Sequence, residues 1–308
     1  MLDNKAIQRF NSLEFIVTQL VEGFMTGLHK SPFHGFSVEF AEHREYNQGE
    51  SIKHVDWKLF ARTDKLFVKR YEEETNLRCY ILLDDSSSMH YPLKSNPTVS
   101  EPNKITFSIY AAACITKLLQ QQRDAVGLSV FSDNIELFTP VRSSMEHQRF
   151  LFTEYEKLID NYKISDKKKT DVTNSLHLLA EKIHKRSLIV LFTDMFDTNS
   201  DIDAVFSAMQ HLKYNKNEVV LFHVVDKHKE IDFEFAEKPT KFIDLETNTE
   251  LKINPRLIRQ EYINTQKNLC EKIKLRCQQY QIDFVEADIN LGYNNIMLSF
   301  LKKRQKLH

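Results

Sequence analysis

Oxygen-bearing side chains follow two apolar runs of the sequence and precede one predicted helix. Asp84, Ser86 and Ser88 follow the first run, Asp194 follows the second, and Thr170 lies just before the helix. All five are hard oxygen donors. Mg²⁺ takes six such oxygens and rejects soft ligands. The pattern therefore predicts a magnesium site, which Mn²⁺ or Ca²⁺ could also occupy.

The spacing of the two serines supports this prediction. Ser86 and Ser88 stand at alternate positions, so both hydroxyls can face one point, while Asp84 and Asp194 supply negative charge from neighbouring strands. The alternative interpretation is structural, because aspartate and serine after a strand are common helix N-caps. On the pattern alone, both interpretations stay open.

The threonine of this set has an unusual setting. Thr170 follows three lysines, Lys167–Lys169, whose charges oppose a bound cation unless they point to solvent. Thr173 is therefore a competing ligand.

A catalytic alternative uses the same carboxylates. Asp84, Asp85 and Asp194 with Mg²⁺ would suit a phosphoryl-transfer hydrolase in which an aspartate attacks phosphorus. Such enzymes generally pair their aspartates as DxD, whereas this sequence reads Asp84-Asp85-Ser86. We keep the hydrolase as the second hypothesis.

Glycine is scarce in this chain. Its 308 residues include only six glycines, where average usage gives about 20. The glycine-rich dinucleotide fingerprint, the phosphate-binding loop and the nucleophile elbow are all absent. The sequence thus excludes the common glycine-based routes to nucleotide binding and serine hydrolysis.

Charge and composition exclude further classes of function. A formal net charge of −1 gives no overall field for nucleic acid, and we expect the basic tail at residues 302–306 to be a solvated end. No apolar run approaches the roughly 20 residues of a membrane helix.

Four cysteines without a CxxC pair indicate reduced thiols and a cytoplasmic protein. The twelve histidines show no zinc-site spacing, so we expect structural or surface roles.

Strand and helix patterns alternate from residue 77 onward. Apolar runs rich in Val, Ile, Leu and Phe, separated by amphipathic helices, predict an α/β fold with a doubly wound, mostly parallel sheet covered on both faces. Ligands of such sheets bind at the carboxyl ends of the strands. The predicted strands are 78–83, 125–131, 187–193, 218–225 and 282–287, and the predicted helices are 104–122, 145–160, 172–184, 202–214, 255–280 and 293–302.

The first 76 residues show a different pattern of predicted helices and strands. Apolar residues at helical spacing predict a helix within residues 5–28 that docks onto the rest of the chain, and alternation predicts strands at 36–40 and 66–71. Between these strands lies a dense polar block with the only tryptophan. Its candidate residues either bind a partner or form a buried structural network; they are Arg44, Tyr46, Gly49, Asp56, Trp57 and Arg62.

Two motif sets carry a family resemblance. The order Asp84-x-Ser86-x-Ser88, Thr170, Thr193-Asp194 resembles the metal-ion-dependent adhesion site of von Willebrand factor A domains. The upstream block, from Arg44-x-Tyr46-x-x-Gly49 to Glu72-Glu73-Glu74-Thr75, resembles the signature of the domain of unknown function 58 (DUF58) family. The resemblance runs from about residue 10 to residue 300.

The resemblance implies a binding module rather than a catalyst. It implies a von Willebrand A-like fold of Rossmann-type topology, in which Asp84, Ser86, Ser88, Thr170 and Asp194 hold Mg²⁺ while one open position captures a partner's carboxylate. Family members are commonly encoded beside MoxR-type AAA+ ATPases, which implies such a partner and a chaperone-like role in assembling or activating a client complex. The predicted domains are a helix at 1–30, a β-rich segment at 31–76 and the α/β domain at 77–308, with a hairpin insertion at about 232–253.

Overall fold

The chain divides into two compact units. The first comprises Met1–Gly23 and Leu77–His308, and the second comprises Phe24–Asn76. The computed structural model describes residues 12–29, 43–45, 60–62, 67–69, 77–160, 172–195, 202–245 and 249–305.

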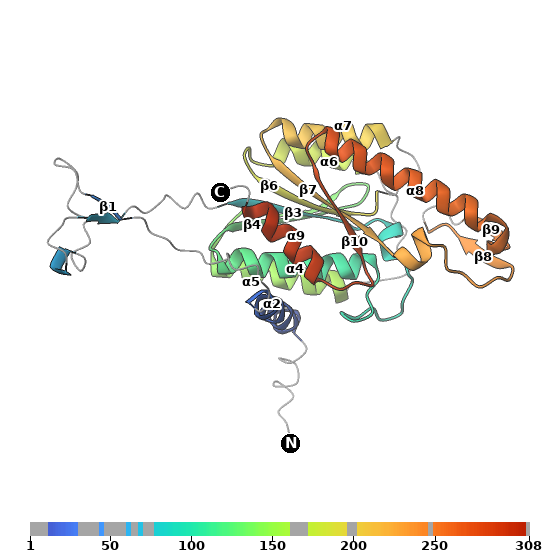
Figure 1. Ribbon diagram of the computed structural model, residues 1–308, viewed down its shortest axis with the longest axis horizontal. Helices are drawn as coiled ribbons and strands as arrows, with labels where there is room; N and C mark the ends of the chain where they lie inside the picture. The colour runs from blue at the N-terminus through green and yellow to red at the C-terminus, as the bar shows by residue number, and fades with distance from the viewer. Residues whose placement is uncertain are drawn as a thin grey trace, which may run out of the picture. The chain divides into compact units, whose positions relative to one another are not determined.

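A six-stranded sheet forms the centre of the first unit (Figure 1). Its strand order is β10-β7-β6-β3-β4-β5, and every neighbouring pair is parallel except β4 with β5. All six residues of β6 are buried, as expected for a strand covered on both faces. These findings confirm the predicted α/β fold with a mostly parallel sheet. The strands are β3 (Arg78–Asp84), β4 (Ala125–Phe131), β5 (Ile135–Phe138), β6 (Leu188–Thr193), β7 (Glu218–Val225) and β10 (Asp283–Asp288).

The antiparallel edge strand β5 was missing from the sequence prediction. It has only four residues, and none of them is fully buried. A short, half-exposed edge strand carries a weak hydrophobic pattern, which explains the omission.

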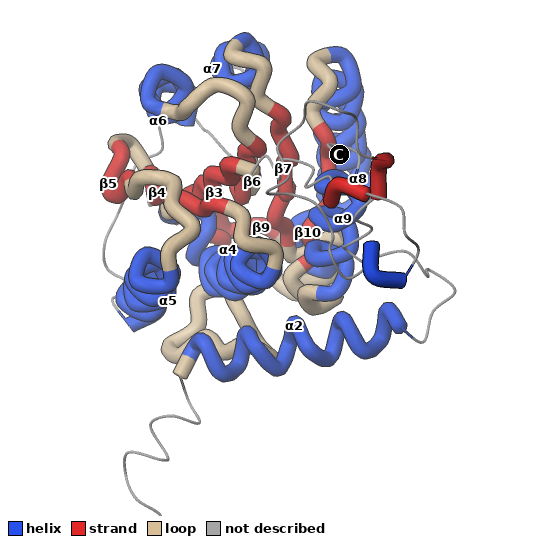
Figure 2. Tube along the Cα trace, turned by 90° about the vertical axis from the view of Figure 1, so that its left-hand side faces the viewer, coloured by secondary structure: helices blue, strands red, loops and turns tan. Residues whose placement is uncertain are grey.

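Helices cover both faces of the sheet. Figure 2 shows α6 and α7 on one face and α4 and α5 on the other. Ile273 and Cys277 of α8 join the apolar core that α6 and α7 build over the first face. On the second face, Phe107 of α4 stacks on Tyr293, just before α9, with ring centroids 4.9 Å apart. The helices are α4 (Lys104–Gln121), α5 (Met145–Asp160), α6 (Val172–Lys182), α7 (Ile202–Tyr214), α8 (Pro255–Gln279) and α9 (Asn294–Gln305).

The start of α4 is fixed by a side-chain cap. Asn103 is the N-cap residue, and its side-chain oxygen accepts a hydrogen bond of 2.9 Å from the backbone N–H of Thr106. The cap ends the preceding loop and makes Lys104 the first residue of the helix. Most of α4 is buried, including the run Ala111–Ala113, whose small side chains permit close packing.

A helix and a small lobe extend the first unit. In α2 (Leu13–His29), Leu13, Val17 and Val21 are buried at helical spacing. The Leu13 N–H donates to Glu156 of α5. The insertion lobe, residues 227–253, contains η3 (Lys227–Ile231), β8 (Thr240–Ile243) and β9 (Glu250–Ile253).

The insertion lobe has an aromatic core of its own. Phe233 is 4% exposed and packs on Phe242 and on Tyr262 of α8, with ring centroids 5.8 and 4.3 Å apart. Phe235 meets Phe242 edge to face. These contacts hold the antiparallel pair β8–β9 against the first half of α8.

The second unit is described at two short strands and one helical turn. β1 (His43–Glu45) pairs antiparallel with β2 (Phe67–Lys69), and residues 60–62 are helical. The strand predicted at 36–40 lies outside the described residues.

The basic tail differs from the expected solvated end. Lys303 forms ion pairs with Glu218 and Asp283, and Arg304 pairs with the buried Asp124. The helix α9 brings these cations back over the sheet, where acidic groups at strand termini neutralise them. None of the helices in the described part of the chain combines the length and apolarity needed to cross a membrane.

Candidate functional site

The candidate site begins at the carboxyl end of β3. Asp84 is fully buried there. Its Oδ1 accepts a hydrogen bond of 3.0 Å from the Ser86 N–H, and its Oδ2 accepts one of 2.6 Å from the Thr193 hydroxyl. Because β3 and β6 are adjacent parallel strands, their ends bring Asp84 and Thr193 together although 109 residues separate them.

The two serine hydroxyls lie side by side next to this carboxylate. Ser86 precedes the short helix η2 (Ser87–His90), and the Oγ atoms of Ser86 and Ser88 are 3.1 Å apart. Two oxygens on adjacent corners of a magnesium octahedron, each about 2.1 Å from the ion, lie about 3.0 Å apart. The two hydroxyls thus have the separation that adjacent magnesium ligands require.

Asp194 is held by a buried ammonium group. The Nζ of Lys104 donates to Asp194 Oδ2 at 2.7 Å and to Glu230 Oε1 at 2.6 Å. Both Lys104 and Asp194 side chains are nearly inaccessible, at 1% and 2% exposure. Glu230 lies in η3 and also accepts the Asp226 N–H at 2.7 Å. Lys104 therefore ties the end of β6 to the start of the insertion lobe.

The charges in this region perturb each other. Burial and the nearby Asp194 carboxylate together raise the pKa of Asp84 to about 7, although hydrogen bonds from Thr193 and Ser86 oppose the shift. Burial alone would lower the pKa of Lys104, but the charges of Asp194 and Glu230 outweigh it and raise that pKa. The Lys104 ammonium is shared by the two carboxylates of Asp194 and Glu230, and Asp194 in turn raises the pKa of Asp84, so added positive charge would be favourable beside Asp84.

His223 supports the same strand end from β7. Its Nε2 lies 3.1 Å from the Asp194 backbone oxygen. Burial lowers its pKa to about 4, although the Asp194 carboxylate acts in the opposite direction. The ring is therefore neutral near pH 7 and donates its Nε2 proton to that oxygen.

The structure describes one of the two candidate threonine ligands. Thr170 and Lys167–Lys169 lie outside the described residues. Thr173, the competing ligand, is described, and its buried hydroxyl has no hydrogen-bond partner within the described part of the chain. The nearby Ser175 hydroxyl bonds to the Ser132 oxygen, which places the start of α6 beside the end of β4.

The upstream signature residues fall mostly beyond the described ranges. Arg44 lies in β1, and Arg62 is exposed in the helical turn at residues 60–62. Tyr46, Gly49, Asp56 and Trp57 lie outside the described residues. Their partner-binding or structural role stays a prediction.

Sequence reasoning missed Lys104, Glu230 and His223. Lys104 is 90 residues from Asp194 and 126 from Glu230, and no local motif marks any of the three. The one available signal is a lysine at the first position of a helix, where a cation is unfavourable unless an acid lies nearby.

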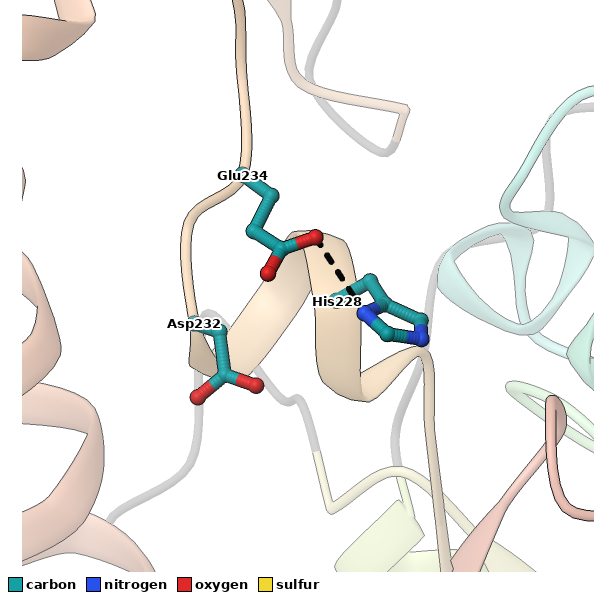
Figure 3. A group of neighbouring side chains, drawn as sticks. All are labelled: His228, Asp232 and Glu234. Atoms are coloured by element: carbon teal, nitrogen blue, oxygen red, sulfur yellow. Dashed lines mark ion pairs between the residues drawn. The ribbon is translucent and has the colours of Figure 1, made fainter.

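A second group of metal-binding residue types lies on the insertion lobe. His228, Asp232 and Glu234 each place one possible ligand atom within 4.8 Å of the other two. Among the described residues, they are the group of three His, Cys, Asp or Glu side chains that lie this close together. Figure 3 shows the Glu234 carboxylate directed at His228, and Glu234 Oε2 lies 3.2 Å from His228 Nδ1. Both side chains are more than half exposed, so the arrangement is that of a surface ion pair.

Comparison with known proteins gives distant relatives. The chain is 25% identical over 146 residues to "Uncharacterized protein Rv1480" of Mycobacterium tuberculosis and equally to "Uncharacterized protein Mb1516" of Mycobacterium bovis. Each match covers 47% of this chain and 44% of the relative, so less than half of either relative's length is matched.

Two solved structures resemble the chain weakly. BatB from Bacteroides thetaiotaomicron covers 75% of this chain and 98% of its own at 14% identity, with a TM-score of 0.46. An aerotolerance-related membrane protein from Bacteroides fragilis covers 73% and 99% at 16% identity, with a TM-score of 0.42.

The family assignment comes from a longer match. Residues 42–271, about three quarters of the chain, match the family described as "Protein of unknown function DUF58". This range includes the polar block around Trp57 and the strand ends that carry Asp84 and Asp194. The chain therefore belongs to the DUF58 family.

Proposed function

We propose that this protein is a non-enzymatic binding module that captures a carboxylate of a partner protein through Mg²⁺ at the end of its sheet. The proposed ligands are Asp84, Ser86, Ser88, Thr170 and Asp194, with Thr173 as the alternative threonine. The observation that carries the proposal is the pair of serine hydroxyls, 3.1 Å apart, beside the buried Asp84.

The chemistry of the donors fits a hard divalent cation. Ser86 and Ser88 offer neutral oxygens, and Asp84 offers a carboxyl group whose pKa is raised by burial and by the Asp194 carboxylate. With few charged ligands, a bound ion would stay electrophilic and accept a further carboxylate oxygen at an open position. The fold part of the proposal is a von Willebrand A-like, doubly wound topology, for which the site's position at the carboxyl ends of parallel strands is favourable.

The state of the carboxylates argues against the hydrolase hypothesis. Both oxygens of Asp84 accept hydrogen bonds, and Asp194 is bound by Lys104. A nucleophilic carboxylate needs an oxygen directed at its substrate. Here the two aspartates are instead oriented by hydrogen bonds and an ion pair, as the carboxylate ligands of a metal site commonly are.

The partner is proposed from the family resemblance. A MoxR-type AAA+ ATPase, acting with this protein in assembling or activating a client complex, would supply the carboxylate. A cytoplasmic location is part of the same proposal.

Calorimetry with Mg²⁺ and Mn²⁺ tests the metal site. We expect the wild type to bind one ion and to melt at a higher temperature with Mg²⁺ than with EDTA, because ligands that bind only the folded state stabilise it. The double variant Ser86→Ala/Ser88→Ala should lose both effects. Ser100→Ala is a matched control, since the Ser100 hydroxyl also lies 3.2 Å from another hydroxyl, that of Thr98, but on the exposed surface.

Equal Mg²⁺ binding by the double variant and the wild type would overturn the proposed site. A second assay separates the two function classes. Sustained Mg²⁺-dependent turnover of a generic phosphate ester, lost in Asp84→Asn but kept in Ser86→Ala, would favour the hydrolase. Capture of the candidate ATPase that disappears in EDTA would favour the binding module.

A further inference from the structure

Two histidines meet between α6 and α7. The Nδ1 atoms of His177 and His211 are 3.2 Å apart, with ring centroids separated by 5.4 Å. Both side chains are half-buried. Because 34 residues separate them, no sequence spacing could have indicated this pair.

The separation of the two nitrogens suits a metal ion. Two nitrogens bound to one tetrahedral zinc ion, each about 2.0–2.1 Å from it, lie about 3.3 Å apart. The observed 3.2 Å is close to this separation. Without a metal, the contact requires opposite tautomers, in which one Nδ1 donates its proton to the other. With both rings in the Nε2-protonated tautomer, both Nδ1 lone pairs are available to a metal ion.

The helices hold both rings in place. His177 is flanked by the buried Leu176, and His211 by the buried Leu212; both leucines belong to the same apolar core. Figure 2 shows α6 and α7 side by side over the sheet. A chelating pair on two packed helices is better preorganised than one on loops.

A solvent-accessible cavity opens onto the pair. Its volume is about 550 Å³, and His177 and His211 lie in its wall together with Ser207, Gln210 and Tyr280. The cavity gives room for water or a small anionic ligand at the coordination positions that the protein leaves open. Hydroxyl and amide groups in the wall can hydrogen-bond to such ligands.

We propose that His177 and His211 form a bidentate site for a borderline transition-metal ion, Zn²⁺ in the first instance, with solvent in the remaining positions. Imidazole selects zinc and copper over magnesium. The site is chemically distinct from the oxygen donors around Asp84, and the proposal does not depend on the proposed adhesion function.

Zinc titration of the full-length protein tests the proposal. Calorimetry in a non-coordinating buffer, with excess Mg²⁺ present to saturate hard oxygen sites, should show zinc binding that His177→Gln or His211→Gln weakens at least about tenfold, the effect of losing even an outer partner of a zinc ligand. Glutamine keeps a polar side chain at each position, and melting in EDTA verifies that both variants fold.

Two further variants locate the binding event. His184→Gln removes an exposed histidine just beyond the end of α6 and should change nothing. His228→Gln removes the imidazole of the exposed group on the insertion lobe. With Cu²⁺ as the probe, electron paramagnetic resonance should show two coordinated nitrogens in the wild type and in His228→Gln, but one in His177→Gln.

The result that overturns the proposal is equally specific. Zinc affinity unchanged in both His177→Gln and His211→Gln would show that the pair is only a hydrogen bond. Zinc binding lost in His228→Gln and kept in the other two would assign it to the insertion lobe instead.

Discussion

Lys104 is the residue whose replacement should reduce the stability of the folded protein most. Its ammonium is buried between Asp194 and Glu230, and removing it leaves a buried carboxylate without its cation. Breaking a buried ion pair from one side costs about 3–5 kcal/mol. We expect Lys104→Met to lower the free energy of unfolding by that amount, measured by urea denaturation in EDTA.

Lys104→Arg provides the control for this prediction. It retains the charge, so it should lose less stability than Lys104→Met even though its fork-shaped head fits the space differently. A free energy of unfolding for Lys104→Met within about 1 kcal/mol of the wild-type value would contradict this prediction. The buried pair would then contribute no more than a typical surface ion pair.

His223 should make the folded state sensitive to acid. Its pKa is lowered to about 4 in the folded protein, while the unfolded chain keeps the ordinary value near 6.5. The unfolded state therefore binds more protons between these values. The contribution of His223 is complete above pH 6.5 and is lost as the pH falls toward 4, by about 2 kcal/mol at pH 5.

Comparison with His223→Gln isolates this effect. Asp84 acts with the opposite sign, because its pKa is raised to about 7 and its contribution is lost as the pH rises toward that value. Subtracting the urea midpoints of His223→Gln from those of the wild type at pH 7.5 and pH 5 cancels the Asp84 contribution. A pH-independent difference between the two proteins would contradict the assignment of a neutral, buried His223.

At the scale of elements, continuous apolar runs were the reliable signal. β6 and β7 are buried along nearly their whole length, so their composition alone marks them as central strands. The half-exposed β5 carries no such signal. Helix bounds were also close, because α7 and α8 begin and end at strong changes in pattern.

Only part of the candidate site could be predicted from the sequence. Asp84, Ser86 and Ser88 form a local motif, and strand order then explains why Thr193 meets Asp84. Contacts that join distant elements leave no local trace. The bond from Lys104 to Glu230 depends on η3 lying over the start of α4, which only the three-dimensional fold shows.

For the molecule as a whole, Asp124 joins the two ends of the α/β domain. It lies in the turn before β4 and is 3% exposed. Its Oδ1 accepts the N–H of Leu77, where the domain begins, and its Oδ2 accepts bonds of 2.8 and 2.7 Å from Arg304 near the end of α9. A two-pronged guanidinium–carboxylate contact of this kind is among the stronger polar interactions.

Arg304→Met should therefore destabilise the whole domain rather than fray one helix. The change removes the guanidinium group that pairs with a buried carboxylate, and the expected loss of stability is about 3 kcal/mol. For a domain of this size, such a loss lowers the melting temperature by about 6–12 °C. Lys302→Met, two residues earlier on the exposed side of α9, is the control and should change the melting temperature little. If Arg304→Met increased hydrogen exchange only within α9 and left the melting temperature unchanged, α9 would be an appendage, and the first unit would depend on its sheet and remaining helices alone.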